Sequence, residues 1–197
     1  MKEMTLREIE NLLGEKIKIV ADKPSRTLAD IPVGETFKVG DMEFIVLEHT
    51  DFGTNVILKE FWKTAKFDDD TSNYAKSKIR KELNKEFYNK LSALVGTQNI
   101  VEHTVDLTTD DGRKDYGSVT DAISLLTCDM YRKYVDILDN YNPEKWWWLA
   151  TSYSTAAKGY SYAVRCVRNG GTLGSSSCNC NIGVRPFCRL VSSISVS

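Results

Sequence analysis

The chain has 197 residues, of which 42% are hydrophobic and 27% charged, and its formal net charge is −1. These values are typical of a soluble globular protein with room for one full domain. They disfavour nucleic-acid binding, which needs a strongly basic surface. No apolar run approaches the roughly 18 residues of a membrane-spanning helix. The charged N-terminus also lacks the apolar core of a signal peptide, so we expect a protein that stays in the cytosol or leaves the cell by lysis.

The first 22 residues predict a small lead-in segment. Residues 5–13 place four apolar side chains at helical spacing behind a capping-box pattern, and residues 17–20 predict a short strand. A polar connection follows, so we predict a lead-in over residues 1–22 and a main domain over residues 31–197. The lead-in is too small to fold alone. We expect it to pack on the main domain or on a second copy of the chain, which would give a homo-oligomer.

The main domain opens with strands and continues with a helix. Gly40 and Asp41 make a turn between two apolar-rich runs, a pattern typical of a β-hairpin, and residues 55–62 predict a further strand. Residues 77–95 give the clearest helical pattern, with apolar side chains every fourth residue and charges between them. Ser77 is a good N-cap for this helix.

The second half of the chain returns to strands. Residues 118–138 predict two short helices, the first capped by Ser118 or Thr120. Residues 146–151, 160–167 and 182–190 are β-type runs separated by turns rich in Gly, Ser and Asn, and we expect them to form one sheet. Strands, then helices, then strands predict an α+β fold with an antiparallel or mixed sheet.

Three tryptophans stand side by side at 146–148. Because side chains alternate along a strand, Trp146 and Trp148 would face one side and Trp147 the other. A central strand with both faces covered would bury all three. In the alternative, Trp147, or whichever tryptophan lies nearest the loops, belongs to an aromatic recognition surface.

Four motifs are spread over about 160 residues of the chain. They are Gly34-Glu35-Thr36-Phe37, the run Ser77–Asn84 with Phe87 and Tyr88, Trp146-Trp147-Trp148-Leu149, and Gly183-Val184-Arg185-Pro186-Phe187. In sequence and order they resemble the motifs of a bacterial and phage domain family of unknown function. That family often has Arg-Ser-Pro after its tryptophan run, where this chain has Ala150-Thr151-Ser152, so a role of that arginine is not carried over.

The closing part resembles a wider group of proteins. Residues 163–169 and the Gly-Val-Arg ending are similar to the last strands of formylglycine-generating-enzyme-like domains and of C-type-lectin-like phage receptor-binding proteins. The resemblance implies a C-type-lectin-like fold, in which short helices and long loops flank a small twisted, mostly antiparallel sheet. It also implies that the tryptophan run is a central strand and that the closing strand lies in the same sheet.

The sequence predicts no catalytic residue, metal site or cofactor. His49 and His103 fit no specific catalytic triad. The acidic runs 68–70 and 110–112 do not fit the spacing of an EF-hand calcium loop. Arg80 and Arg185 are expected to be structural, Arg80 by tying its helix to a loop and Arg185 by bonding backbone carbonyls or a carboxylate inside the fold.

The five cysteines leave one alternative open. Cys166 and the Cys178/Cys180 pair could be the thiols of an oxidase similar to formylglycine-generating enzymes, because thiolates bind soft metals. However, Cys-x-Cys alone is a weak signal and no histidine lies nearby. We therefore predict reduced, free cysteines.

The remaining candidate is a binding surface between residues 151 and 181, which combine Tyr, Ser, Asn, Gly and Arg as antibody paratopes do. The resemblance to phage proteins favours a non-enzymatic, phage- or prophage-encoded module that binds a host protein or glycan, in the host cytosol or on a virion. A structural virion protein is a further alternative. The predicted binding residues are Tyr153, Tyr160, Tyr162, Arg168, Asn169, Ser176 and Asn179.

Overall fold

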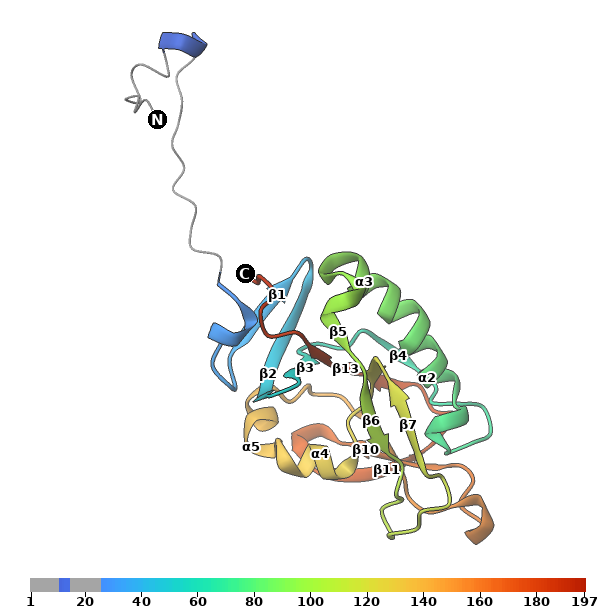
Figure 1. Ribbon diagram of the computed structural model, residues 1–197. Coiled ribbons are helices and arrows are strands. Elements are labelled where there is room, and N and C mark those ends of the chain that lie inside the picture. Colours follow the sequence, from blue (N-terminus) through green and yellow to red (C-terminus); the bar gives the residue numbers. More distant parts are fainter. Residues whose placement is uncertain (1–10, 15–25) are drawn as a thin grey trace.

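The computed structural model describes residues 11–14 and 26–197. The lead-in predicted over residues 1–22 therefore lies almost entirely outside the described residues, and its packing stays a prediction. The packed body already includes Thr27, which forms a β-bridge to Ser195, and the fully buried Leu28. This segment brings the start of the domain against its C-terminus (Figure 1).

The described residues form an α+β fold with mostly antiparallel sheets, as the sequence predicted. The first sheet has the order β1-β2-β3-β13-β5, and β8 also pairs with β13. The turn of the predicted hairpin, with Gly40 at φ +58°, joins its first two strands. Its strands are β1 (Thr36–Val39), β2 (Met42–Thr50), β3 (Gly53–Leu58), β5 (Ile100–Val101), β8 (Ile123–Ser124) and β13 (Phe187–Leu190).

The second sheet has the order β11-β10-β9-β12-β4, and its only parallel pair among the described strands is β9 with β12. A separate hairpin of β6 and β7 completes the strands. The bounds are β4 (Lys63–Ala65), β6 (His103–Asp106), β7 (Ser118–Asp121), β9 (Trp147–Ser152), β10 (Ala163–Val167), β11 (Leu173–Ser177) and β12 (Ile182–Val184).

Helices cover the sheets from two sides (Figure 1). One long helix comprises α2 (Lys78–Glu82), a π-helical turn (Leu83–Phe87) and α3 (Tyr88–Val95). Two short helices, α4 (Cys128–Lys133) and α5 (Val135–Leu138), pack against a second apolar cluster. In the part of the chain that the structure describes, no helix is long and apolar enough to cross a bilayer.

The π-helical turn follows from the spacing of the apolar side chains. Ile79, Leu83, Phe87 and Leu91 are all fully buried. In a regular α-helix each residue turns about 100°, so two side chains four residues apart are about 40° out of alignment around the helix axis. The wider turn at 83–87 reduces this drift and keeps the four side chains on one face. The helix starts as predicted, because the Ser77 hydroxyl accepts a hydrogen bond from the Arg80 N–H.

Strand β9 divides the interior into two apolar cores. Trp148 packs in the core that contains the buried face of the long helix, and Trp147 packs in the core beneath α4 and α5. Every residue of β9 is buried. Trp146 precedes the strand and is 36% exposed, so the expectation that all three tryptophans are buried is wrong. The Trp146 side chain lies beyond the layers that cover β9.

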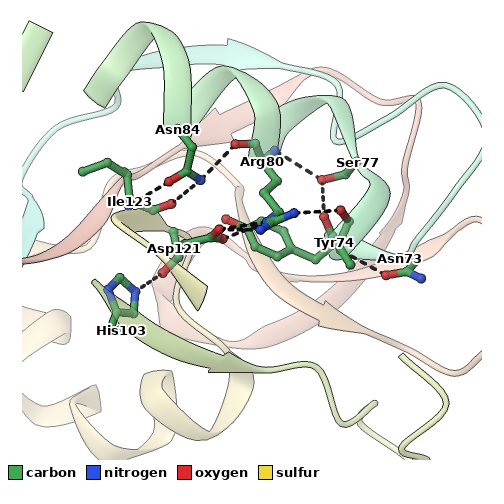
Figure 2. Close-up of polar contacts among 10 residues, drawn as sticks. Asn73, Tyr74, Ser77, Arg80, Asn84, His103, Asp121 and Ile123 are labelled. Atoms are coloured by element: carbon green, nitrogen blue, oxygen red, sulfur yellow. Dashed lines mark hydrogen bonds and ion pairs between the residues drawn. The ribbon is translucent and has the colours of Figure 1, made fainter. Parts of the chain in front are cut away.

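The Arg80 guanidinium ties the long helix to β7 (Figure 2). Its Nε donates to both carboxylate oxygens of Asp121, at 2.9 and 3.0 Å, and its Nη2 donates to Asp121 Oδ1 at 2.7 Å. Nη1 donates to the Ala75 carbonyl. The Asp121 side chain is only 3% exposed, so the guanidinium supplies the hydrogen bonds that water would otherwise give. Arg80 thus holds its helix to a strand, whereas the sequence led us to expect that it holds the helix to a loop.

The prediction of helix from residue 118 is wrong for residues 118–124, which form β7 and β8. Asp121 is fixed by Arg80, and Asn84 bonds both the N–H and the carbonyl of Ile123. These long-range partners hold the segment extended despite its helix-compatible pattern. The first helix starts only at Thr127, whose hydroxyl accepts from the Met130 N–H.

The run 182–190 is not one strand of one sheet, as the sequence suggested. β12 belongs to the second sheet and β13 to the first, and the chain crosses between them at Arg185 and Pro186. The fully buried Arg185 donates from Nε to the Leu58 carbonyl at 2.8 Å and from Nη2 to the Tyr141 carbonyl at 3.3 Å. Its guanidinium carbon lies 5.3 Å from the centre of the Trp147 ring. Backbone carbonyls, rather than a carboxylate, are therefore the partners of Arg185.

Replacing Arg185 tests this junction. We expect Arg185→Ala to lower the free energy of unfolding by about 3 kcal/mol, because two buried carbonyls lose a donor and a cavity forms. Arg185→Met keeps much of the volume and removes a buried charge, so its loss should be smaller by about 1 kcal/mol. Urea denaturation measures both. The exposed Arg132→Ala serves as the control, and an unchanged stability of Arg185→Ala would contradict the structural role.

Candidate functional site

Three exposed tyrosines lie in the segment between the end of β9 and the start of β10. Tyr153, Tyr160 and Tyr162 are 40%, 40% and 51% exposed. The rings of Tyr153 and Tyr160 contact each other, with centroids 5.0 Å apart and planes tilted by 51°. We call these three residues the tyrosine surface. Their phenol groups offer apolar area and a hydrogen-bonding tip to a partner.

The loop that carries the tyrosines is fixed on one side by the β6–β7 connection. The Tyr116 hydroxyl accepts a hydrogen bond from the Ala156 N–H at 2.9 Å. The Ser154 hydroxyl donates to Asp111 Oδ2 at 2.7 Å. Both partners lie in the connection between β6 and β7, and no local pattern in the sequence indicated this contact.

The same loop is also held by Ser72, whose hydroxyl lies 3.5 Å from that of Tyr116. The Ser72 N–H donates to the Ser161 carbonyl, and the Ser72 hydroxyl donates to the Tyr160 carbonyl at 3.1 Å. The Cys178 N–H donates to the Tyr162 carbonyl at 2.7 Å. Segments from four parts of the chain thus meet at this end of the second sheet, and they hold the tyrosine backbone in place.

The other predicted binding residues divide between two ends of β10. Asn179 is exposed and follows Cys178, near the tyrosine surface, while the half-buried Ser176 pairs with Val164 on β10. Arg168 and Asn169 are exposed but follow the far end of β10. Five strand residues span about 16 Å at about 3.3 Å per residue. The structure therefore does not bring Arg168 and Asn169 to the tyrosine surface.

Arg168 has partners of its own at that far end. Its guanidinium carbon lies 5.1 Å from the centre of the Trp146 ring, a cation–π contact. A Cβ atom added to Gly174 would collide with the Arg168 side chain. Arg168 thus lies between the indole ring and the glycine backbone of β11, so part of its surface is already used within the fold.

The acidic runs act as local anchors. Asp68 accepts hydrogen bonds from the N–H groups of Asp69, Asp70 and Lys78, and its pKa is lowered by these bonds although burial opposes the shift. Hydrogen bonds from Thr109 and Ser154 lower the pKa of Asp111 to about 2. Within the described residues, no three side chains of His, Cys, Asp or Glu gather where they could hold a metal ion.

Four of the five cysteines are buried, and all five are free thiols. Burial raises the pKa of Cys166 to about 11, and it also raises the pKa of Cys128, Cys178 and Cys188. These thiols are therefore protonated at neutral pH, whereas the thiolate is the form that attacks substrates and binds metals. Only Cys180 is exposed.

A buried serine–histidine pair was not predicted from the sequence. His103 Nε2 lies 2.8 Å from the Ser124 hydroxyl, and both side chains are buried (Figure 2). The two residues are 21 positions apart and become neighbours only through tertiary folding. Burial, and then the charge of Arg189, lowers the pKa of His103 to about 4, so the ring is neutral at pH 7. Because Ser124 is fully buried, this pair supports packing rather than attack on a substrate.

Thiol titration checks the burial of the cysteines. We expect Ellman's reagent to modify only Cys180 rapidly in the native protein, because the other four thiols are buried and protonated. The remaining thiols should react after unfolding in urea. Cys180→Ser should abolish the rapid phase, and a second thiol that reacts as fast as Cys180 would contradict the structure.

The depressed pKa of His103 predicts a pH-dependent stability. Between pH 6.5 and 4, His103 is protonated in the unfolded chain but stays neutral in the folded state. The free energy of unfolding therefore falls as the pH is lowered through this window. The full loss from this one group is about 3 kcal/mol. Urea denaturation of the parent and His103→Gln at several pH values isolates the contribution. Equal pH slopes in the two proteins would contradict it.

Comparison of the chain with protein-family models, with curated protein sequences and with solved structures found no match. The arrangement of the chain's own residues is therefore what bears on its function. That arrangement combines buried, protonated thiols and a buried histidine with exposed aromatic side chains held by fixed loops.

Proposed function

We propose that this protein is a non-enzymatic binding module of C-type-lectin-like fold, encoded by a phage or prophage, that recognises a host protein or glycan through the tyrosine surface. The observation that carries the proposal is the set of three exposed tyrosines on a loop fixed by hydrogen bonds from distant segments. Aromatic side chains dominate binding energy at protein interfaces. A fixed loop also loses little conformational freedom when a partner binds.

The topology supports the C-type-lectin-like assignment in two respects. The tryptophan strand β9 is the middle strand of the second sheet, and β12, which carries the closing Gly-Val pair, lies next to it. The resemblance implied both features, although the second holds only for β12, because β13 lies in the first sheet. Loops of the second sheet, including the segment between β9 and β10, gather at one end, where a binding surface on a rigid scaffold is commonly placed.

The thiols favour binding over the oxidase alternative. An oxidase that uses Cys166 or Cys178 needs a thiolate within reach of oxidant and substrate. Both side chains are buried, with pKa values above that of an ordinary thiol. The exposed Cys180 would have to act without an exposed thiol partner.

Alanine substitutions at Tyr153, Tyr160 and Tyr162 test the proposal. Tagged parent protein should retain a partner from surface or cytosolic fractions of the bacterial host, and the affinity is then measured with the purified partner. Each single change should cost about 2 kcal/mol of binding free energy, and the triple variant should lose most binding. Melting temperatures verify folding.

Phe52→Ala is the matched control, because Phe52 is a highly exposed aromatic residue outside the tyrosine surface. It should bind as the parent does. If the triple tyrosine variant also binds normally, while changes at Asp68–Asp70 or His103 abolish binding, the partner contacts another part of the molecule.

A further inference from the structure

A polar groove lies at the end of β10 opposite the tyrosine surface. Its larger part, about 660 Å³, is lined by Asp139, Asn142, Glu144 and Asn169 among others. Its smaller part, about 330 Å³, shares Glu144 and Asn169 with the larger part and adds Trp146 and Asn181. Because the two parts share these side chains, they adjoin each other, and we call them together the Trp146 groove.

Trp146 lines the smaller part of this groove, and the residue is 36% exposed. Arg168, at the end of β10, lies over the ring. The smaller cavity is also lined by Ile182 and Gly183 of β12 and by Thr64 of β4. The cation–π contact therefore holds an indole that is still accessible from the cavity.

The wall formed by the loop 169–171 is fixed before any ligand arrives. The Tyr131 hydroxyl donates to the Gly171 carbonyl at 2.5 Å. A Cβ atom on Gly171 would lie 2.6 Å from Asp139 Oδ1, so the backbone and this carboxylate are in close contact. With its amide oxygen turned toward the loop, Asn142 accepts hydrogen bonds from the N–H groups of Gly170 and Gly171. Such a preorganised wall lowers the entropic cost of binding.

The polar side chains of the groove are free to bond a ligand. Glu144 and Asp139 have no ion-pair partner among residues 26–197, and neither Asn169 nor Asn181 makes a side-chain hydrogen bond there. Carboxamides donate and accept, and carboxylates accept. The two carboxylates are balanced by Lys145 in the lining and by Arg168 beside the Trp146 ring, so the groove has no net charge that would select a charged ligand.

We infer that the Trp146 groove binds a neutral saccharide. A pyranose ring presents an apolar C–H face, which suits the indole, and a rim of hydroxyl groups that both donate and accept. The carboxamides of Asn169 and Asn181 and the carboxylate of Glu144 match that rim. A purely apolar ligand would leave these groups without hydrogen bonds, at a cost in affinity. The inference concerns a different surface from the tyrosine surface and does not depend on its partner.

Titration of the ¹⁵N-labelled protein with glucose, galactose, mannose and N-acetylglucosamine tests the inference. The indole N–H signal of Trp146 is assigned by its loss in Trp146→Phe. At least one sugar should shift this signal saturably. Glu144→Ala and Asn181→Ala should each weaken that sugar's binding about tenfold, equivalent to about 1.4 kcal/mol. Neither side chain supports the fold through a hydrogen bond in the described residues, so both variants should keep the parent melting temperature.

Tyr153→Ala is the control that separates this site from the tyrosine surface, and it should bind the sugar as the parent does. The inference is overturned if none of the four sugars shifts the Trp146 signal, or if the Glu144 and Asn181 variants bind the sugar with parental affinity. Loss of sugar binding in Tyr153→Ala would also overturn it, because the sugar would then occupy the tyrosine surface. If the tyrosine variants do not weaken binding of a protein partner, the proposed function fails, but the inference about the Trp146 groove is not affected.

Discussion

The buried guanidinium of Arg185 is the contact on which the arrangement of the two sheets depends. Only Arg185 and Pro186 separate β12 of the second sheet from β13 of the first. At this crossing the guanidinium bonds the carbonyl that ends β3 and the carbonyl of Tyr141, and it lies against the Trp147 ring. Burial lowers the pKa of Arg185 to about 10, so the side chain is still charged at neutral pH. A buried cation is tolerated because backbone carbonyls replace part of its hydration.

Strand β9 pairs with β10 and β12, and the roles of the three tryptophans follow from its position. With apolar layers on both faces, consecutive side chains enter different cores, so Trp147 and Trp148 are both buried. Trp146 stands one residue before the strand, where these layers end. The same sequence of three indoles therefore supplies packing on two faces and one partly exposed ring for the Trp146 groove.

Most of the cysteine thiols are buried, and the two proposed binding surfaces lie at the two ends of the second sheet. The serine–histidine pair and four of the thiols are buried, while the tyrosine surface and the Trp146 groove lie at opposite ends of β10. Both ends are fixed by side chains from distant segments, such as Tyr116 at one end and Tyr131 at the other. Two separate surfaces on one rigid sheet could engage two different ligands without competing for the same residues.

The sequence by itself determined the features that depend on near neighbours. The apolar repeat and the Ser77 cap specify the long helix, Gly40 permits the hairpin turn at positive φ, and the exposed tyrosines lie in a segment of polar turn residues. Tertiary structure decided the features that depend on distant partners. Residues 118–124 are strands because Arg80 and Asn84 bond them. The run 182–190 divides between sheets because Arg185 bonds β3, and Arg168 lies far from the tyrosines because β10 separates them. Local patterns report which faces are apolar, but they do not report which distant group satisfies a buried charge or pairs with a strand.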